Sequence, residues 1–80
     1  MISAEEIVRR IEGAIPGAKA MVRDIGGGNH WSAVVVAQAF EGQSLVDQHK
    51  MVYAPLKDAM ADQSIHALQL KTMTPAEAGQ

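Results

Sequence analysis

The feature that most constrains this sequence is a long helical segment between two predicted β-strands. The strands cover residues 30–38 and 65–72, and about 26 residues separate them. Parallel neighbouring strands need a crossover connection of a dozen or more residues, usually a helix, whereas antiparallel neighbours can be joined by a tight turn. We therefore expect these two strands to lie side by side and to run parallel.

A further strand is predicted before this pair. Residues 18–25 mix apolar and charged side chains between glycine signals, which favours a half-exposed strand. The glycine-rich segment 26–29 follows, and because glycine tolerates positive φ, it predicts a flexible hairpin into residues 30–38. The valine run at 34–36 is expected to be central and buried.

Along the chain, helices are predicted before the first strand, between the second and third strands, and after the third strand. Ser3 and Glu6 have the spacing of a capping box, and apolar residues at helical intervals indicate a helix over residues 4–15. Pro55 is expected to kink or split the long helix. Thr74, Pro75 and Glu77 have the cap, first-turn proline and acidic residue of a short closing helix. The apolar stripe of the long helix is predicted to consist of Leu45, Val46, His49, Val52, Tyr53, Leu56 and Met60.

The fold class that follows is α+β, with the element order αββααβ and a short terminal helix. We expect a three-stranded mixed sheet, antiparallel between the hairpin strands and parallel across the helical connection, with helices packed on it. No repeat, low-complexity tract or linker divides the chain. Residues 1–80 are therefore predicted to form a single domain.

The composition argues against several classes of function. The chain contains no cysteine, so it has no thiolate nucleophile, and any metal site must rely on histidine or carboxylate. Seven basic and nine acidic residues give a net charge of −2, whereas nucleic-acid modules usually carry a basic excess. The apolar runs are too short for a membrane helix, and the N-terminus lacks the basic and apolar regions of a signal peptide. We therefore expect no membrane association and a cytoplasmic location.

Two of the three histidines begin predicted strands. His30 opens one strand and His66 opens its parallel neighbour, so both side chains are expected at the same edge of the sheet. The neighbouring glycine-rich loop can adjust to place the His30 imidazole at a shared metal. From spacing alone, surface or hydrogen-bonding roles are more frequent for such histidines than metal ligation. His49 lies on the apolar stripe of the long helix, where a packed, hydrogen-bonded role is favoured.

No complete catalytic set is present in the sequence. No serine or threonine is placed by motif as a nucleophile and no paired carboxylates are evident, so we predict that the chain is not an enzyme. The glycine-rich segment 26–29 leads into a strand instead of a helix N-terminus, which favours a hairpin over a phosphate cradle. Trp31 begins a strand and, if exposed, could stack on a base or a partner surface. Packing in the core or at an edge is the more usual role of such a tryptophan.

Several segments, taken together, resemble the BolA family. The resemblance covers nearly the whole chain and is closest to the bacterial acid-stress BolA-like branch. It implies a fold related to the type II KH domain, and a role in stress response. The matching segments are Asn29-His30-Trp31, Phe40-Glu41-Gly42-Gln43-Ser44-Leu45-Val46, Val52-Tyr53-Ala54-Pro55-Leu56, Ile65-His66-Ala67-Leu68 and Thr74-Pro75-Ala76-Glu77.

The resemblance also implies a partner and a cofactor. BolA-like proteins are partners of monothiol glutaredoxins that carry a Cys-Gly-Phe-Ser sequence. In the heterodimer, the glutaredoxin cysteine and glutathione ligate one side of a [2Fe-2S] cluster, and the BolA-like protein ligates the other. Carried over by position, the metal-binding ligands are the strand histidine His66 and the hairpin-loop ligand His30. Because imidazole must be neutral to bind, acid is expected to favour cluster loss.

Two other functions compete with cluster binding. A KH-like nucleic-acid-binding regulator would need Arg23, Lys50, Lys57 and Lys71 to form one basic face. The segment 47–50 is less basic than the Arg-His-Arg of many relatives, which argues against duplex DNA binding. The third alternative is a homodimeric interaction domain, in which the two strand histidines only pack.

Overall fold

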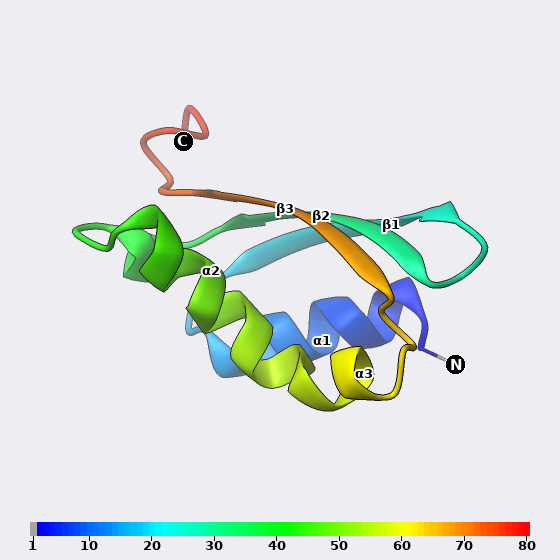
Figure 1. Ribbon diagram of the computed structural model, residues 1–80. Coiled ribbons are helices and arrows are strands. Elements are labelled where there is room, and N and C mark those ends of the chain that lie inside the picture. The colour runs from blue at the N-terminus through cyan, green and yellow to red at the C-terminus, as the bar shows by residue number, and fades with distance from the viewer. Residues whose placement is uncertain (1) are drawn as a thin grey trace.

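The computed structural model describes residues 2–80 and places the helices against one face of a three-stranded sheet (Figure 1). The order agrees with the predicted αββααβ arrangement, with small shifts at the strand ends. None of the described helices is long and apolar enough to cross a membrane. In chain order the elements are α1 (Ala4–Ala14), β1 (Lys19–Gly26), β2 (His30–Val36), a 3₁₀ turn (Gln38–Phe40), α2 (Leu45–Tyr53), a 3₁₀ turn (Ala54–Leu56), α3 (Lys57–Ala61) and β3 (Ala67–Met73).

The sheet has the predicted mixed topology. β2 lies at the centre, antiparallel to β1 and parallel to β3. Ala33 pairs with Val22 on one side and with Leu70 on the other, which fixes the register of all three strands. Val35 and Val36 are buried as expected, whereas Val34 is only half-buried. The helical crossover therefore produces the parallel pair that its length predicts.

The second face of the sheet, called the open face below, carries no helix in the described chain (Figure 1). Strand side chains alternate between the two faces, so every second residue of each strand belongs to the open face. The residues assigned to it are Lys19, Met21 and Arg23 from β1, His30, Ser32, Val34 and Val36 from β2, and Ala67, Gln69, Lys71 and Met73 from β3.

Helix α1 begins at a side-chain cap. The Ser3 hydroxyl accepts a hydrogen bond from the Glu6 amide at 3.1 Å, which satisfies one of the free donors of the first turn. The Glu6 carboxylate accepts from Arg10 Nε at 2.8 Å instead of reaching back to the Ser3 amide. The predicted capping box is thus correct only for its Ser3 half. Ile7 and Ile11, one turn apart, are fully buried and anchor the helix.

The long helix is split at Pro55, as predicted. Pro55 lies in the 3₁₀ turn between α2 and α3, where its missing N–H removes a helical hydrogen bond. The predicted apolar stripe is wrong at its start, because Leu45 and Val46 are each 63% exposed and nothing in the described chain packs over this first turn. The buried positions of this segment are Gln48 and Val52 in α2, Leu56 in the 3₁₀ turn and Ala59 in α3.

The hydrophobic core lies between the helices and the covered face of the sheet. Its buried and partly buried side chains come from every helix and from all three strands, so each element buries its apolar face against the others. The largest side chains that are almost completely buried are Phe40, Ile7, Ile11, Ile15, Leu56, Ile65, Val35 and Val52.

The predicted closing helix after β3 is wrong. Residues 74–80 form turns, although Thr74 and Glu77 make the reciprocal bonds of a helix cap. The Thr74 amide donates to Glu77 Oε1 at 2.8 Å, and the Glu77 amide donates to Thr74 Oγ1 at 3.2 Å. Gly79 then has a positive φ of 80°, so the chain does not continue as a helix beyond this turn.

Candidate functional site

His30 and His66 meet at one end of the sheet, where the β1–β2 hairpin and the start of β3 lie together on the right of Figure 1. Their ring centroids are 5.2 Å apart and the rings are nearly perpendicular, at 87°. The His66 amide donates to the Asn29 carbonyl at 2.8 Å, which ties the chain before β3 to the hairpin. The predicted convergence of the two histidines is confirmed, and both side chains are exposed.

The parallel pairing of β2 and β3 positions this pair. His30 is the first residue of β2 and pairs with Ala67, the first residue of β3. His66 immediately precedes that pair, so it lies just outside the strand that was predicted to include it. Because the two strands run in the same direction, both start at the same edge, and their histidines become neighbours despite their separation in sequence.

The hairpin that leads into His30 is ordered by a side chain that the sequence analysis did not single out. Asp24 Oδ1 accepts hydrogen bonds from the amides of Gly26 at 2.9 Å and Gly28 at 3.2 Å. Gly27 and Gly28 have positive φ values of 68° and 77°, which explains why glycine suits these positions. An aspartate followed two residues later by glycine is a turn signal that could have indicated this role. Asp24 therefore fixes the shape of the loop beside His30.

Both histidine rings of the pair have an oxygen near Nδ1. His30 Nδ1 lies 3.3 Å from the carbonyl oxygen of Gly26, within the hairpin. His66 Nδ1 lies 2.6 Å from Oε1 of Gln63, in the turn before β3. Gln63 is a second supporting residue that the sequence did not indicate, since a glutamine in a connecting segment carries no motif. Each imidazole is thus oriented through the same ring nitrogen.

Trp31 has a structural role next to this pair. It is only 3% exposed, so the alternative in which it stacks on a base or a partner surface is wrong. Its indole faces the helices, and Nε1 donates to the Ser64 carbonyl at 3.3 Å. The bond joins the start of β2 to the segment that carries His66. The buried Trp31 therefore links the start of β2, which carries His30, to the segment that carries His66.

His49 takes no part in the site. It lies on α2, half-buried, with its ring edge-on to Tyr53 at a centroid distance of 6.1 Å. The predicted packing is present, but we find no hydrogen bond from its ring to another described residue. The buried face of α2 runs one position earlier, through Gln48 and Val52, which leaves His49 on the flank of the helix.

The described residues do not form a complete metal-binding group around the two histidines. No group of three or more His, Cys, Asp or Glu side chains in residues 2–80 has an arrangement that could hold a metal ion. His30 and His66 supply two imidazoles at an exposed edge, and the sequence has no thiolate. A metal centre held by this pair must take its remaining ligands from another molecule.

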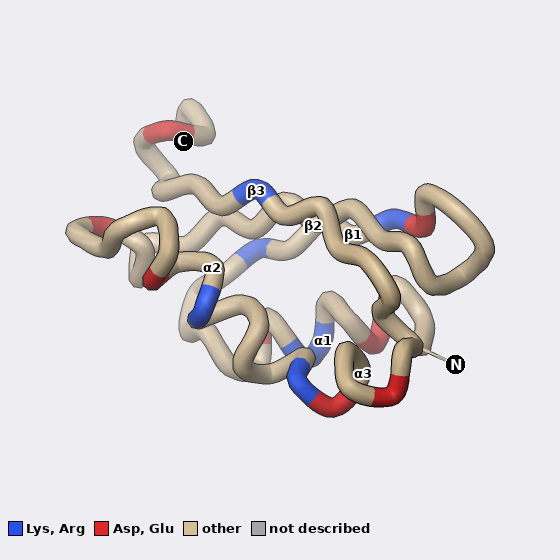
Figure 2. The backbone as a smooth tube through the Cα atoms, in the orientation of Figure 1, with Lys and Arg blue, Asp and Glu red and all other residues tan. Residues whose placement is uncertain are grey.

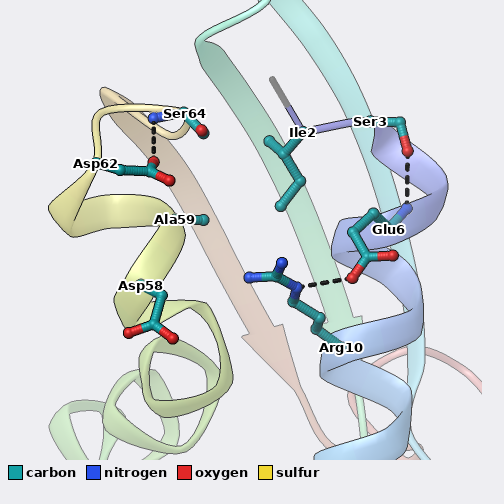
Figure 3. Close-up of a pocket in the computed structure, with 8 residues that line it drawn as sticks. All are labelled: Ile2, Ser3, Glu6, Arg10, Asp58, Ala59, Asp62 and Ser64. Carbon is teal, nitrogen blue, oxygen red and sulfur yellow. Dashed lines mark hydrogen bonds and ion pairs between the residues drawn. The ribbon is translucent and has the colours of Figure 1, made fainter.

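A separate pocket lies on the helix side of the same end (Figure 3). Its volume is about 370 Å³, and it opens between α1, α3 and the segment after α3. Its charge is mainly acidic, because Arg10 is its one basic residue and is bonded to Glu6. Neither histidine of the pair lines it. The lining residues are Ile2, Ser3, Glu6, Arg10, Asp58, Ala59, Asp62 and Ser64.

Two carboxyl groups of this pocket have lowered pKa values. Hydrogen bonds from Arg10 and then Arg9 hold the pKa of Glu6 below its ordinary value of 4.5. Hydrogen bonds from the side chain and then the backbone of Ser64 lower the pKa of Asp62 from 3.8. Both carboxylates are therefore ionised near neutral pH, which makes the pocket a poor site for an anionic ligand.

The basic residues named for nucleic-acid binding do not share one face. Arg23 and Lys71 belong to the open face of the sheet, whereas Lys50 and Lys57 lie on α2 and α3, in the other layer (Figure 2). These four residues therefore do not form the single basic face that the nucleic-acid alternative requires. Trp31 is buried on the helix side, so its indole is not available on the open face for stacking with bases.

The protein is a small α+β domain with two exposed histidine rings close together at one end of its sheet. The sequence matches the BolA-like protein family over residues 14–77. Because this match covers most of the chain, the protein belongs to the BolA-like family.

Similar proteins agree with this assignment. The acid stress protein IbaG of Escherichia coli (strain K12) is 42% identical over 52 residues, which cover 65% of this chain and 62% of IbaG. The matched part is therefore less than two thirds of IbaG's length. The structure of a bolA protein homologue from Coxiella burnetii superimposes with a TM-score of 0.80 at 34% identity, covering all of both chains. The BolA domain of SufE1 from Arabidopsis thaliana has a TM-score of 0.81 at 28% identity, covering 96% of this chain and 99% of the domain.

Proposed function

We propose that this protein is a non-enzymatic partner of a monothiol glutaredoxin and that it contributes histidine ligands to a shared [2Fe-2S] cluster. The observation that carries the proposal is the pairing of His30 and His66, with ring centroids 5.2 Å apart at an exposed edge. His66 is the ligand fixed by the start of a strand, and His30 is the ligand on the hairpin.

The donor set of this chain fits one half of such a cluster. A [2Fe-2S] cluster needs four ligands, and histidine can replace cysteine on one of its two irons. The two imidazoles, with no third ligand group among the described residues, match the two protein ligands that one iron of the cluster needs. The glutaredoxin cysteine and glutathione would supply the thiolates that this chain lacks. Exposure of both rings leaves room for a second protein to approach.

The surrounding residues would hold the ligands in place without touching the metal. When bound, the cluster supplies one-electron chemistry, and histidine ligation raises its reduction potential above that of an all-cysteine cluster. Asp24 shapes the hairpin under His30, and Trp31 fastens the segment before His66. We propose that this part of the chain orients the two histidines and binds the cluster through them, and that it carries out no catalytic step.

The cellular role that fits this function is iron-sulfur trafficking or regulation under stress in the cytoplasm. A relative named for acid stress supports the stress assignment. The proposed shared ligation supports trafficking, because a cluster held between two proteins is more easily passed on than one enclosed by a single chain.

The experiment is anaerobic mixing of the chain with a monothiol glutaredoxin that carries a glutathione-ligated cluster, followed by visible absorption and circular dichroism. We expect a heterodimer with an altered cluster spectrum. His66→Ala should abolish the change and His30→Ala should weaken it, because these remove the two ligands. His49→Ala is the matched control, since it removes an imidazole outside the site. No complex and no spectral change with the wild-type chain would contradict the proposal.

A further inference from the structure

The turn before β3 contains an unusual backbone conformation at Gln63. Its φ is 68°, and it is the one non-glycine residue in the described chain with positive φ. Side chains with a Cβ rarely adopt this left-handed region, which glycine or asparagine occupies more readily. Glycine would fit this backbone conformation better, so a function of the glutamine side chain would explain its presence here.

Neighbouring bonds hold this turn without help from the Gln63 side chain. Asp62 Oδ1 accepts from the Ser64 amide at 2.8 Å, and the Ser64 carbonyl accepts from Trp31 Nε1 at 3.3 Å. The Ile65 amide donates to the Ala59 carbonyl at 2.9 Å. The path of the backbone through Gln63 is therefore fixed from both sides, and the side chain is available for another task.

That side chain reaches one atom of the proposed site. Gln63 Oε1 lies 2.6 Å from His66 Nδ1. An amide oxygen can only accept a hydrogen bond, so this contact is a hydrogen bond only in the tautomer that carries the proton on Nδ1, in which the lone pair of the neutral ring lies on Nε2. His30 has the same arrangement from the backbone, because its Nδ1 faces the Gly26 carbonyl at 3.3 Å. Both rings thus offer Nε2 as the metal-binding atom.

We propose that Gln63 is a positioning residue, which holds His66 in the Nδ1–H tautomer and directs its Nε2 toward the shared metal. Metal-binding histidines usually donate their other ring N–H to an oxygen, which fixes the tautomer and the orientation of the ring. The inference rests on the proposed function of His66 as a cluster ligand. It adds that the left-handed backbone at Gln63 is retained for its side chain.

The test begins with the chain alone. Long-range proton–nitrogen NMR of the imidazoles, at about pH 8 where ordinary histidine is neutral, reports which ring nitrogen carries the proton. We expect Nδ1–H on His66 in the wild type and a shift toward Nε2–H in Gln63→Leu. Gln63→Glu keeps an acceptor and should preserve Nδ1–H. Gln38→Leu, an exposed substitution at the other end of β2, is the matched control.

Gln63→Gly separates positioning from folding. Because glycine readily adopts positive φ, the unfolding temperature of the Gln63→Gly variant should equal or exceed that of the wild type. The Nδ1–H signature of His66 should be lost in this variant. In the heterodimer with the cluster-loaded glutaredoxin, Gln63→Gly and Gln63→Leu should weaken cluster retention by about 10- to 100-fold, as expected for loss of an outer-shell partner. The tautomer of His30 should not change in any variant.

The outcomes are distinct for the two proposals. An Nε2–H tautomer at His66 in the wild type, or one that Gln63→Leu leaves unchanged, overturns the assignment of Gln63. Equal cluster retention by Gln63→Leu and the wild type overturns it as well. A wild-type chain that forms no cluster complex contradicts the proposed function, whereas the NMR result still decides whether Gln63 sets the tautomer of His66.

Discussion

The Thr72 hydroxyl donates a hydrogen bond to Oε1 of Gln48 at 2.6 Å, and this bond joins β3 to α2 inside the protein. Both residues are less than a tenth exposed. The Gln48 amide nitrogen in turn donates to the Gln43 carbonyl at 3.0 Å. A buried polar bridge of this kind stabilises only when every member is satisfied, so each partner depends on the other.

Removing one partner of this bridge is predicted to destabilise the fold. Thr72→Val keeps the shape of the side chain but leaves Gln48 Oε1 buried without that donor, which should lower the free energy of unfolding by about 1–3 kcal/mol. Chemical denaturation measures the change. Adding Gln48→Leu to Thr72→Val should recover part of the loss, and a purely additive double variant would contradict the coupling.

Trp31→Phe is predicted to loosen the segment that carries His66. The substitution removes the Nε1 donor to the Ser64 carbonyl and part of a buried ring, so we expect a loss of about 1–3 kcal/mol in stability. Hydrogen exchange should be faster at the His66 amide than in the wild type. Tyr53→Phe, a change to a half-buried ring away from the site, is the control. Unchanged exchange at His66 would show that Trp31 does not restrain it.

Stability is predicted to depend on pH through Glu6. Because Arg10 and Arg9 lower its pKa in the folded chain, its contribution is complete above its ordinary value of 4.5. The contribution is lost as pH falls through the lowered, folded value. Glu6→Gln should therefore melt below the wild type near neutral pH, and the two melting curves should converge in acid. Added salt should also reduce the difference, since the group is at the surface. A gap that persists in acid would indicate a packing effect.

Binding to duplex DNA is predicted to be weak. Arg23 and Lys71 lie in one layer and Lys50 and Lys57 in the other, so few of them can contact the same phosphate backbone. Fluorescence anisotropy should show affinity no tighter than ordinary non-specific binding, about 10⁻⁴ to 10⁻⁶ M at physiological salt. Tighter, salt-sensitive binding that is lost in Lys71→Ala would instead support the nucleic-acid alternative.

The sequence predicted the features that depend on chain connectivity. The length of the crossover predicted the parallel pairing of β2 with β3, and the parallel pairing predicted that His30 and His66 converge. Pro55 indicated the break between α2 and α3 because a proline removes a helical donor wherever it lies. These inferences need only local periodicity and geometry, which the sequence contains.

The features that the sequence did not predict depend on tertiary contacts. Gln48 is buried because Thr72 and the Gln43 carbonyl satisfy its amide, and a hydrophobic pattern cannot identify such a residue. Leu45 is exposed although it is apolar, since nothing in the described chain packs over its turn. The left-handed backbone conformation of Gln63 also could not be predicted from the sequence, because glycine is the residue that normally indicates that conformation.

The parallel pairing of β2 and β3 also determines when the histidine pair forms. The β1–β2 hairpin can form early because its contacts are local, whereas β3 must close a long loop before it meets β2. The pair therefore exists only after the crossover has folded. A ligand that bridges both imidazoles would bind the native chain more tightly than the unfolded one, so it would raise the resistance of the protein to unfolding and proteolysis as its concentration rises. Under the proposed function, the lifetime of the protein should therefore increase with the supply of that ligand.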